Sequence, residues 1–202
     1  MNDPVDRPVV NVEGRLVAIG PFTCDAHELY YRWINDFANH QAAMPVSPPR
    51  TFEQERERIE RWSRNANDAA FTIYERASWS PIGVTELGGI NHRSGTAEFS
   101  IMIGEPAARG KGYGTETTQL VLDYGFTALG LQNIMLTVRE YNYAARRAYE
   151  KAGFKEFGRR RKCWRFAGRW WDAIYMDVLA EEFESLVLAA VLRPDEERHE
   201  PS

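Results

Sequence analysis

The chain has 202 residues, of which 44% are hydrophobic and 27% are charged, and its formal net charge is −4. These values are typical of a globular protein with a sizeable core, and they exclude a globally disordered chain. The negative net charge argues against nucleic-acid binding through bulk positive charge. No apolar run is long enough to span a bilayer, and the first residues lack a signal-peptide pattern. We therefore expect a cytoplasmic protein with neither a nucleic-acid partner nor a membrane partner.

The two cysteines, Cys24 and Cys163, lie far apart and outside any metal-ligand spacing. They predict neither a disulfide framework nor a zinc site, so we expect no metal. Both ends of the chain are polar, and no linker or repeat interrupts the residues between them. This pattern predicts one domain over residues 13–192, with flexible tails at residues 1–12 and 193–202.

The first half of the chain predicts one strand, two helices and then three strands. The strand covers residues 13–22, and Asp25 could cap the helix that follows. Thr51 and Gln54 match a capping box at the start of a charged and largely exposed helix. Residues 69–75, 81–91 and 96–104 have the composition of strands and are separated by turn residues, which indicates an antiparallel meander.

The second half of the chain predicts helices that alternate with strands. Apolar residues recur at intervals of three and four from Thr118 to Leu129, as on one face of a helix. Further elements are a buried strand at residues 133–139, a helix at 143–152, strands at about 156–166 and 170–179, and a closing amphipathic helix at 180–192. This order predicts an α/β (α+β) fold, in which helices flank a mixed, mostly antiparallel sheet of seven strands.

The most informative segment is RGKGYG at residues 109–114, between a predicted strand and a predicted helix. Its alternate glycines leave the backbone N–H groups free to turn toward an anion, and the N-terminus of the next helix favours a phosphate. Arg109 and Lys111 add positive charge. A glycine-rich surface turn is the alternative interpretation. The spacing fits neither a Walker A loop nor a dinucleotide-binding fingerprint, so we expect a pyrophosphate site in a different fold.

A second segment, NYAARRAYEKAGF at residues 142–154, places Asn142 and Tyr149 two helical turns apart on one face. Its alanines keep this helix slim enough for another molecule to lie against it. Together, RGKGYG and NYAARRAYEKAGF resemble the motifs of the GNAT N-acetyltransferase superfamily. The order of the predicted elements is also similar to that fold over residues 13–179, which is most of the chain.

The resemblance implies a sheet that is splayed between its fourth and fifth strands, with acetyl-CoA bound as co-substrate in the gap. It assigns coenzyme contacts to Met102, Ile103, Arg109, Gly110, Lys111, Gly112, Tyr113, Gly114, Thr115, Asn142 and Ala145. It gives Tyr149 the role of the general acid that protonates the departing thiolate. The acceptor amine then attacks the thioester directly in a ternary complex, without a covalent enzyme intermediate.

The acceptor amine must lose a proton before it can attack, because a lysine-like amine is charged at neutral pH. A carboxylate can accept that proton directly or through water. Glu98, near the expected splay, is the first candidate for this general base, and Glu86 on the preceding strand is the alternative, as is water alone. For Glu86, a solvent-facing strand position without a catalytic role is the simpler interpretation, whereas for Glu98 the two interpretations are equally open.

The identity of the acceptor is less clearly indicated. Segments such as AEFSIMIG and DYGFTALGL are similar to the RimJ/RimL-type branch and to the spermidine acetyltransferases, which suggests a protein N-terminus or a small-molecule amine as acceptor. A polyamine or an antibiotic remains an alternative acceptor, although the first helical region lacks the many carboxylates that a polyamine site needs. A non-catalytic coenzyme A-binding module is the alternative from another class. Apolar residues of the closing helix could support a homodimer.

Overall fold

The computed structural model describes residues 7–22, 26–42 and 48–193, and its strands form one sheet in the order β1-β2-β3-β4-β5-β6-β8-β7. The strands are β1 (Val12–Glu13), β2 (Val17–Pro21), β3 (Ala69–Glu75), β4 (Pro81–Asn91), β5 (Thr96–Ile103), β6 (Asn133–Arg139), β7 (Lys155–Phe166) and β8 (Arg169–Leu179). Neighbouring strands are antiparallel except for β5 and β6, which are parallel. The predicted mixed, mostly antiparallel sheet is confirmed.

The sheet has eight strands among the described residues instead of seven, because the strand predicted at 13–22 is two strands joined by a tight turn. Glu116 holds this turn by accepting hydrogen bonds from the backbone N–H groups of Arg15 and Leu16. Val12 is buried, and the N–H of Asn11 donates to the carbonyl of Ile19 at 2.8 Å. Residues 9–12 therefore lie beside β2, although we expected them to belong to a tail.

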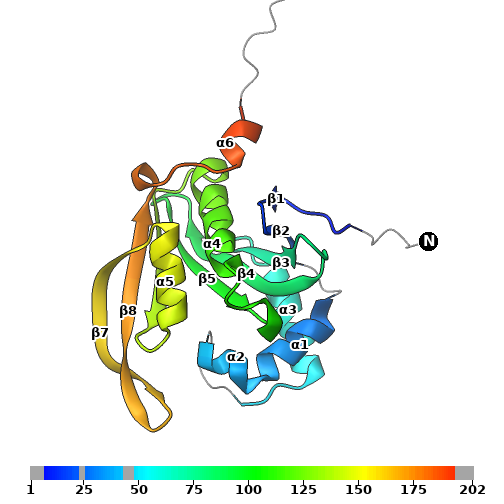
Figure 1. The fold of residues 1–202 in the computed structure, drawn as a ribbon, viewed down its shortest axis with the longest axis vertical. Helices are drawn as coiled ribbons and strands as arrows, with labels where there is room; N and C mark the ends of the chain where they lie inside the picture. Colours follow the sequence, from blue (N-terminus) through cyan, green and yellow to red (C-terminus); the bar gives the residue numbers. More distant parts are fainter. Residues whose placement is uncertain (1–6, 23–25, 43–47, 194–202) are drawn as a thin grey trace, which may run out of the picture.

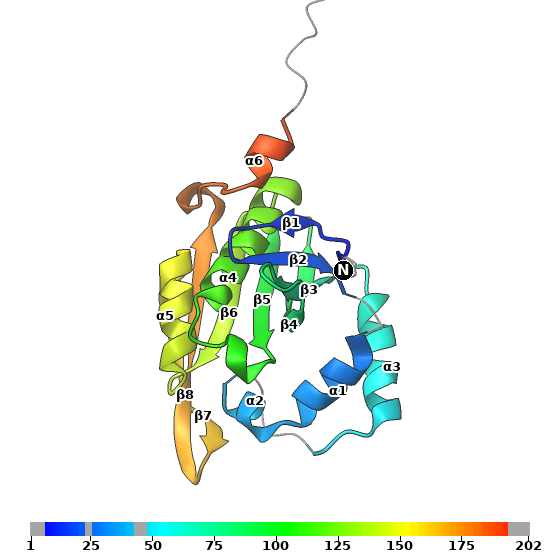
Figure 2. The same cartoon turned by 45° about the vertical axis from the view of Figure 1, so that its right-hand side comes forward.

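Helices cover both faces of the sheet: α4 and α5 lie on one face, and α1 and α3 on the other (Figures 1 and 2). The helices are α1 (His27–Asn35), α2 (Phe37–Ala42), α3 (Phe52–Ser63), α4 (Tyr113–Asp123), α5 (Tyr143–Ala152) and α6 (Leu188–Val191). A π-helical segment, Tyr124–Ala128, extends α4. The capping box of Thr51 and Gln54 is present at the start of α3. Asp25 lies outside the described residues.

The predicted closing helix at 180–192 is wrong. A 3-10 turn (Ala180–Glu182) and an irregular segment precede α6, which is only four residues long. The cause is Asp123, a fully buried carboxylate at the end of α4. It accepts hydrogen bonds from the N–H groups of Leu186, Val187 and Leu188 at 2.8–3.1 Å. Since these N–H groups bind the carboxylate, a continuous helix cannot use them.

The predicted splay is confirmed between β5 and β6. These strands pair only through the three residues Thr96, Ala97 and Glu98 of β5, so the second half of β5 has no pairing with β6. In both ribbon views, α5 and the β7–β8 hairpin lie on one side of the resulting opening, and α1 and α2 lie on the other (Figures 1 and 2). Two cavities adjoin this unpaired part of β5.

Candidate active site

The first cavity has a volume of about 310 Å³ and lies between β5, the loop after it and α5. The described residues that line it are Asn39, Ile101, Ile103, Ala108, Arg109, Gly110, Gly112, Gly114, Thr115, Asn142, Ala144, Ala145, Arg147, Ala148, Tyr149 and Lys151. The two sequence motifs, which are separated by almost thirty residues of other structure, thus face one space. The sequence analysis predicted that both motifs contact the same coenzyme.

The RGKGYG loop has the backbone conformation that an anion cradle needs. Gly110 and Gly112 have φ values of 74° and 87°, a left-handed conformation that L side chains rarely adopt. Gly112 is the N-cap of α4, and the first intrahelical hydrogen bond comes from the N–H of Glu116 to its carbonyl. The N–H groups of the preceding turn therefore have no acceptor within the helix. A phosphate at this N-terminus would accept from them and would interact favourably with the helix dipole.

The side chain of Arg109 turns inward from the cavity wall. Its Nε donates to the carbonyl of Ile103 at 3.3 Å, and its Nη2 donates to the side chain of Asn39. Asn39 is buried and donates to the carbonyl of Trp33 at 2.9 Å. Arg109 thereby connects the end of β5 to α1 and α2. It adds positive charge near the loop while its guanidinium group is used in these contacts.

Three of the predicted coenzyme residues do not line the first cavity. Lys111 is exposed, with Nζ 5.9 Å from the ring centroid of Tyr113. The hydroxyl of Tyr113 donates to Oε1 of Glu75 on β3 at 2.5 Å. Met102 lines the second cavity, while its neighbour Ile103 lines the first. Consecutive residues of a strand point to opposite faces, which explains the different positions of Met102 and Ile103.

The first turn of α5 presents Asn142 and Ala145 to the first cavity. The side chain of Asn142 caps the helix, because its Oδ1 accepts from the N–H of Ala145 at 3.2 Å. Tyr149, two turns further along, lies on the same face, as its spacing predicts. Its ring makes edge-to-face contacts with Phe99 and Phe154, each with centroids 6.0 Å apart.

Burial raises the pKa of Tyr149 well above the usual value for a phenol. The hydroxyl therefore keeps its proton across the physiological pH range. A protonated hydroxyl at this point of the cavity can donate to negative charge that develops on a neighbouring atom. This property is the one that a general acid requires.

The second cavity, of about 470 Å³, lies beside the first. Its described lining residues are Tyr30, Ile34, Arg58, Trp62, Asp68, Val84, Thr85, Glu86, Ser100, Ile101, and Met102. Ile101 of β5 lines both cavities, so the two spaces adjoin at the unpaired part of this strand. A molecule in the second cavity can therefore approach a molecule in the first at β5.

Glu86 is the carboxylate of the second cavity whose protonation is most strongly affected by its surroundings. Burial raises the pKa of this side chain above 4.5, while hydrogen bonds from Ser100 and Trp62 oppose the increase. The nearby carboxylate of Asp68 raises the pKa further, and the positive charge of Arg58 lowers it. A partly desolvated carboxylate with a raised pKa is a better proton acceptor than an exposed one, and such groups are typical of functional sites.

Glu98 lies on the same face of β5 as Ser100, but it is exposed and is not among the described residues that line either cavity. Its Oε1 accepts a hydrogen bond from Thr137 at 3.3 Å. Glu98 pairs with Gly88, and Ser100 pairs with Glu86, in the β4–β5 register. The two glutamates considered from the sequence therefore occupy one face of the sheet, but only Glu86 faces a cavity.

Sequence reasoning missed several lining residues. Arg147 and Lys151 face the first cavity from α5, and a signal was present, because each lies three residues after a cavity-lining alanine of the same helix, Ala144 or Ala148. Arg58, Trp62 and Asp68 line the second cavity from α3 and the loop after it. No local pattern identified these residues, because only the packing of α3 against the sheet brings them to β4 and β5.

The described ranges contain no group of three or more His, Cys, Asp or Glu side chains that could hold a metal ion. Within the same ranges, every helix is too short or too polar to cross a lipid bilayer.

The family model described as "Acetyltransferase (GNAT) domain" matches residues 17–155. Spermidine N(1)-acetyltransferase of Vibrio cholerae serotype O1 is 32% identical over 154 residues, which are 75% of this chain and 88% of that protein. Human alpha/beta-tubulin-N-acetyltransferase 9 is 28% identical over 155 residues, which are 71% of this chain and 74% of the human protein.

The same fold is found among solved structures. The crystal structure of the Vibrio cholerae spermidine N-acetyltransferase in complex with CoA and spermine aligns with a TM-score of 0.76 and 26% identity. The alignment covers 83% of this chain and 97% of that structure.

Proposed function

Because the chain belongs to the GNAT acetyltransferase family, whose domain model matches residues 17–155, we propose that it transfers the acetyl group of acetyl-CoA to a primary amine. One observation carries the proposal: the two adjoining cavities share Ile101 of β5. The RGKGYG loop lines one part of the first cavity, and Tyr149 lines another part. The second contains Glu86, a carboxylate with a raised pKa.

The first cavity is suited to acetyl-CoA as co-substrate. The N–H groups at the start of α4 would donate hydrogen bonds to the pyrophosphate, and Ile103 and Ala145 would contact the pantetheine arm. Arg109 contributes charge and holds the end of β5 in place through its bond to the Ile103 carbonyl. Arg147 and Lys151 add two further cations on the α5 side. These roles explain why positive charge surrounds one cavity of a protein with a negative net charge.

The proposed reaction is a direct transfer in a ternary complex. Glu86, rather than Glu98, accepts a proton from the ammonium group of the acceptor, directly or through water. The neutral nitrogen attacks the thioester carbonyl carbon, a C–N bond forms and the C–S bond breaks. The electron pair of that bond leaves with sulfur, and Tyr149 donates its hydroxyl proton to the thiolate. The attacking nitrogen loses a second proton as it becomes an amide, and this proton restores the Tyr149 hydroxyl through water. In this proposal the N–H of Ile103 stabilises the negative charge that develops on the carbonyl oxygen.

The acceptor is proposed only as a class, a small-molecule or peptide primary amine. Spermidine is a second candidate, supported by the spermidine N-acetyltransferases among the similar proteins and by the two carboxylates, Glu86 and Asp68, in the second cavity. The RimJ/RimL-type assignment and a homodimer remain predictions from the sequence.

The test is thiol release from acetyl-CoA, measured in parallel with spermidine, with short peptides that have free N-termini, with simple alkylamines and with ω-amino acids. Turnover that depends on an amine supports the proposal. Tight acetyl-CoA binding without turnover on any of these amines would contradict it and would favour a non-catalytic coenzyme A-binding module.

A further inference from the structure

Charges of opposite sign line the second cavity. Glu86 projects from β4, and Asp68 precedes β3. A Cβ atom placed on Gly88 would lie 3.7 Å from Oδ1 of Asp68 and 3.8 Å from Cδ of Glu86. The two carboxylates are therefore neighbours on either side of the bare Gly88 backbone. Together they form a negative region that suits an ammonium group.

Arg58 provides the positive charge of this cavity, and a buried carboxylate holds it in place. Glu55 is fully buried and accepts from Nη2 of Arg58 at 2.6 Å and from its Nε at 2.9 Å. It also accepts from Nη1 of Arg50 at 3.0 Å. Two guanidinium groups and one carboxylate give this triad a net charge of +1. A buried ion pair is weak evidence for stability, but it does fix the position of Arg58.

The guanidinium group of Arg58 also packs on an aromatic ring of the cavity wall. Its central carbon lies 5.0 Å from the ring centroid of Trp62. Nε and Nη2 of Arg58 donate to Glu55. Within the described ranges, Nη1 of Arg58 donates to no side chain or carbonyl. A planar guanidinium group fixed in this way is well suited to bind a carboxylate or another oxyanion.

We propose that the acceptor is a zwitterion, with a primary amine bound near Glu86 and Asp68 and an anionic group, such as a carboxylate, bound by Arg58. This inference rests on the proposed function, since it describes the acceptor of the same reaction. It distinguishes the cavity from a polyamine site, because the second ammonium group of a polyamine would face a fixed guanidinium group. An amino acid or an ω-amino acid has the required charges.

Three amines with the same spacer test this inference on the unaltered protein: γ-aminobutyrate, butylamine and trimethylenediamine. They differ only in whether the far end is anionic, neutral or cationic, and longer homologues of each cover other distances between the two charges. A charge-assisted pair of hydrogen bonds predicts that kcat/KM for the best amino acid exceeds that of its matched alkylamine by roughly 10- to 100-fold. The diamines should be the poorest substrates.

The variant Arg58→Met retains the apolar stem of the side chain and removes its charge. It should reduce the ratio of kcat/KM for the amino acid over the alkylamine toward one. Arg56→Met is the matched control, because Arg56 lies on the same helix, is exposed and, among the described residues, forms only a 3.9 Å ion pair with Glu60. That control should leave the ratio unchanged, and circular dichroism checks the folding of both variants.

The possible failures are distinguishable. Equal rates for the three matched amines, or faster turnover of the diamines or of spermidine, would overturn this inference and leave the proposed function intact. A complete lack of turnover on every amine would overturn both. Since the three-amine comparison uses the unaltered protein, it decides the question even where Arg58→Met does not fold.

Discussion

The side chains of Ser100 and Glu86 meet across two neighbouring strands, where Oγ of Ser100 donates to Oε1 of Glu86 at 3.0 Å. The two residues are direct partners in the β4–β5 register. This contact fixes the carboxylate over the part of β5 that no longer pairs with β6. It therefore places a carboxylate in the second cavity, one residue along β5 from Ile101, which also borders the first.

Replacing Glu86 by Gln should lower kcat/KM by about 100-fold or more, the usual contribution of a general base. Since burial raises the pKa of Glu86 above 4.5, the rate should rise with pH as this carboxyl loses its proton. The Glu86→Gln variant should lack this rise in rate with pH. Glu98→Gln is the control, because its side chain is exposed, and it should remain within about threefold of the unaltered protein. The opposite order of effects would assign the base to Glu98.

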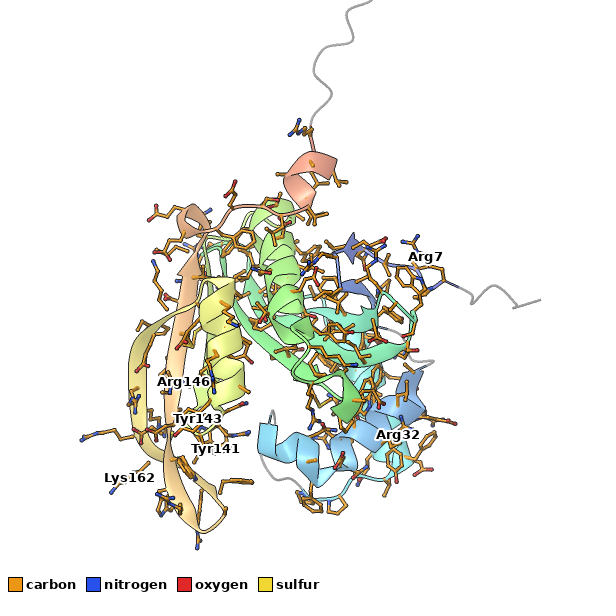
Figure 3. The ribbon with its side chains drawn as sticks, viewed as in Figure 1. Arg7, Arg32, Tyr141, Tyr143, Arg146 and Lys162 are labelled. Carbon is orange, nitrogen blue, oxygen red and sulfur yellow. The ribbon has the colours of Figure 1, made fainter. Side chains whose placement is uncertain are left out.

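Removal of the Tyr149 hydroxyl by Tyr149→Phe should reduce kcat by about 100-fold while the Kd of acetyl-CoA changes little. Because burial raises the pKa of Tyr149, its ionisation should not reduce the rate anywhere between neutral pH and pH 10, about the pKa of a free phenol. The control is Tyr143→Phe, at the exposed start of the same helix near its lower end in Figure 3. Equal kcat values for Tyr149→Phe and the unaltered protein would refute the general-acid role.

Gly112→Ala should destabilise the protein by about 1–2 kcal/mol, because the residue has a φ of 87° that a Cβ atom disfavours. It should also weaken acetyl-CoA binding by altering the direction of the loop N–H groups. Gly114→Ala is the comparison for stability, since Gly114 has no positive φ and a Cβ there would meet no atom within 4 Å. Urea denaturation measures the stability of both variants. The prediction fails if the two variants are equally stable.

Asp123→Asn should destabilise the protein by about 1–3 kcal/mol at neutral pH, because it weakens the buried acceptor of three backbone N–H groups. Burial alone would raise the pKa of Asp123, but hydrogen bonds from Ser185, Leu188, Thr127 and Val187 outweigh it and lower the pKa below 3.8. A lowered pKa in the folded state contributes stability above the unfolded value of 3.8, and this is lost as pH falls through the folded value.

The measurement for Asp123 is urea denaturation at neutral pH and at pH values below 3.8. The difference in stability between the unaltered protein and Asp123→Asn should shrink as the pH is lowered. A difference that does not depend on pH would show that the charge of Asp123 has no part in holding the segment before α6.

Local patterns predicted most of the fold, because periodicity, capping residues and glycine positions act over a few residues. The capping box at Thr51, the splay after Glu98 and the loop ending at Gly114 all follow from such patterns or from the motif resemblance. The failures arise from side chains distant in the sequence. Glu116 holds the turn that divides the first strand, and Asp123 holds the segment that replaces the closing helix.

The candidate site was predicted unevenly for the same reason. The coenzyme side has two contiguous motifs, and most of their members line one cavity. The acceptor side is assembled from α1, α3, β4 and β5, so no short pattern includes Arg58, Asp68 and Glu86 together. The sequence favoured Glu98 as the general base. That Glu86 faces a cavity and Glu98 does not depends on burial and on the register of β4 and β5, which local residues do not reveal.

The most direct test of the account is to follow the acetyl group itself. The protein would be incubated with acetyl-CoA carrying a trideuterated acetyl group and with the best amine of the substrate panel, and all products would be identified by mass spectrometry. We predict that the label appears as an amide on the amine nitrogen, in an amount equal to the coenzyme A released. Label found in free acetate, or covalently on the protein, would contradict direct transfer to an amine.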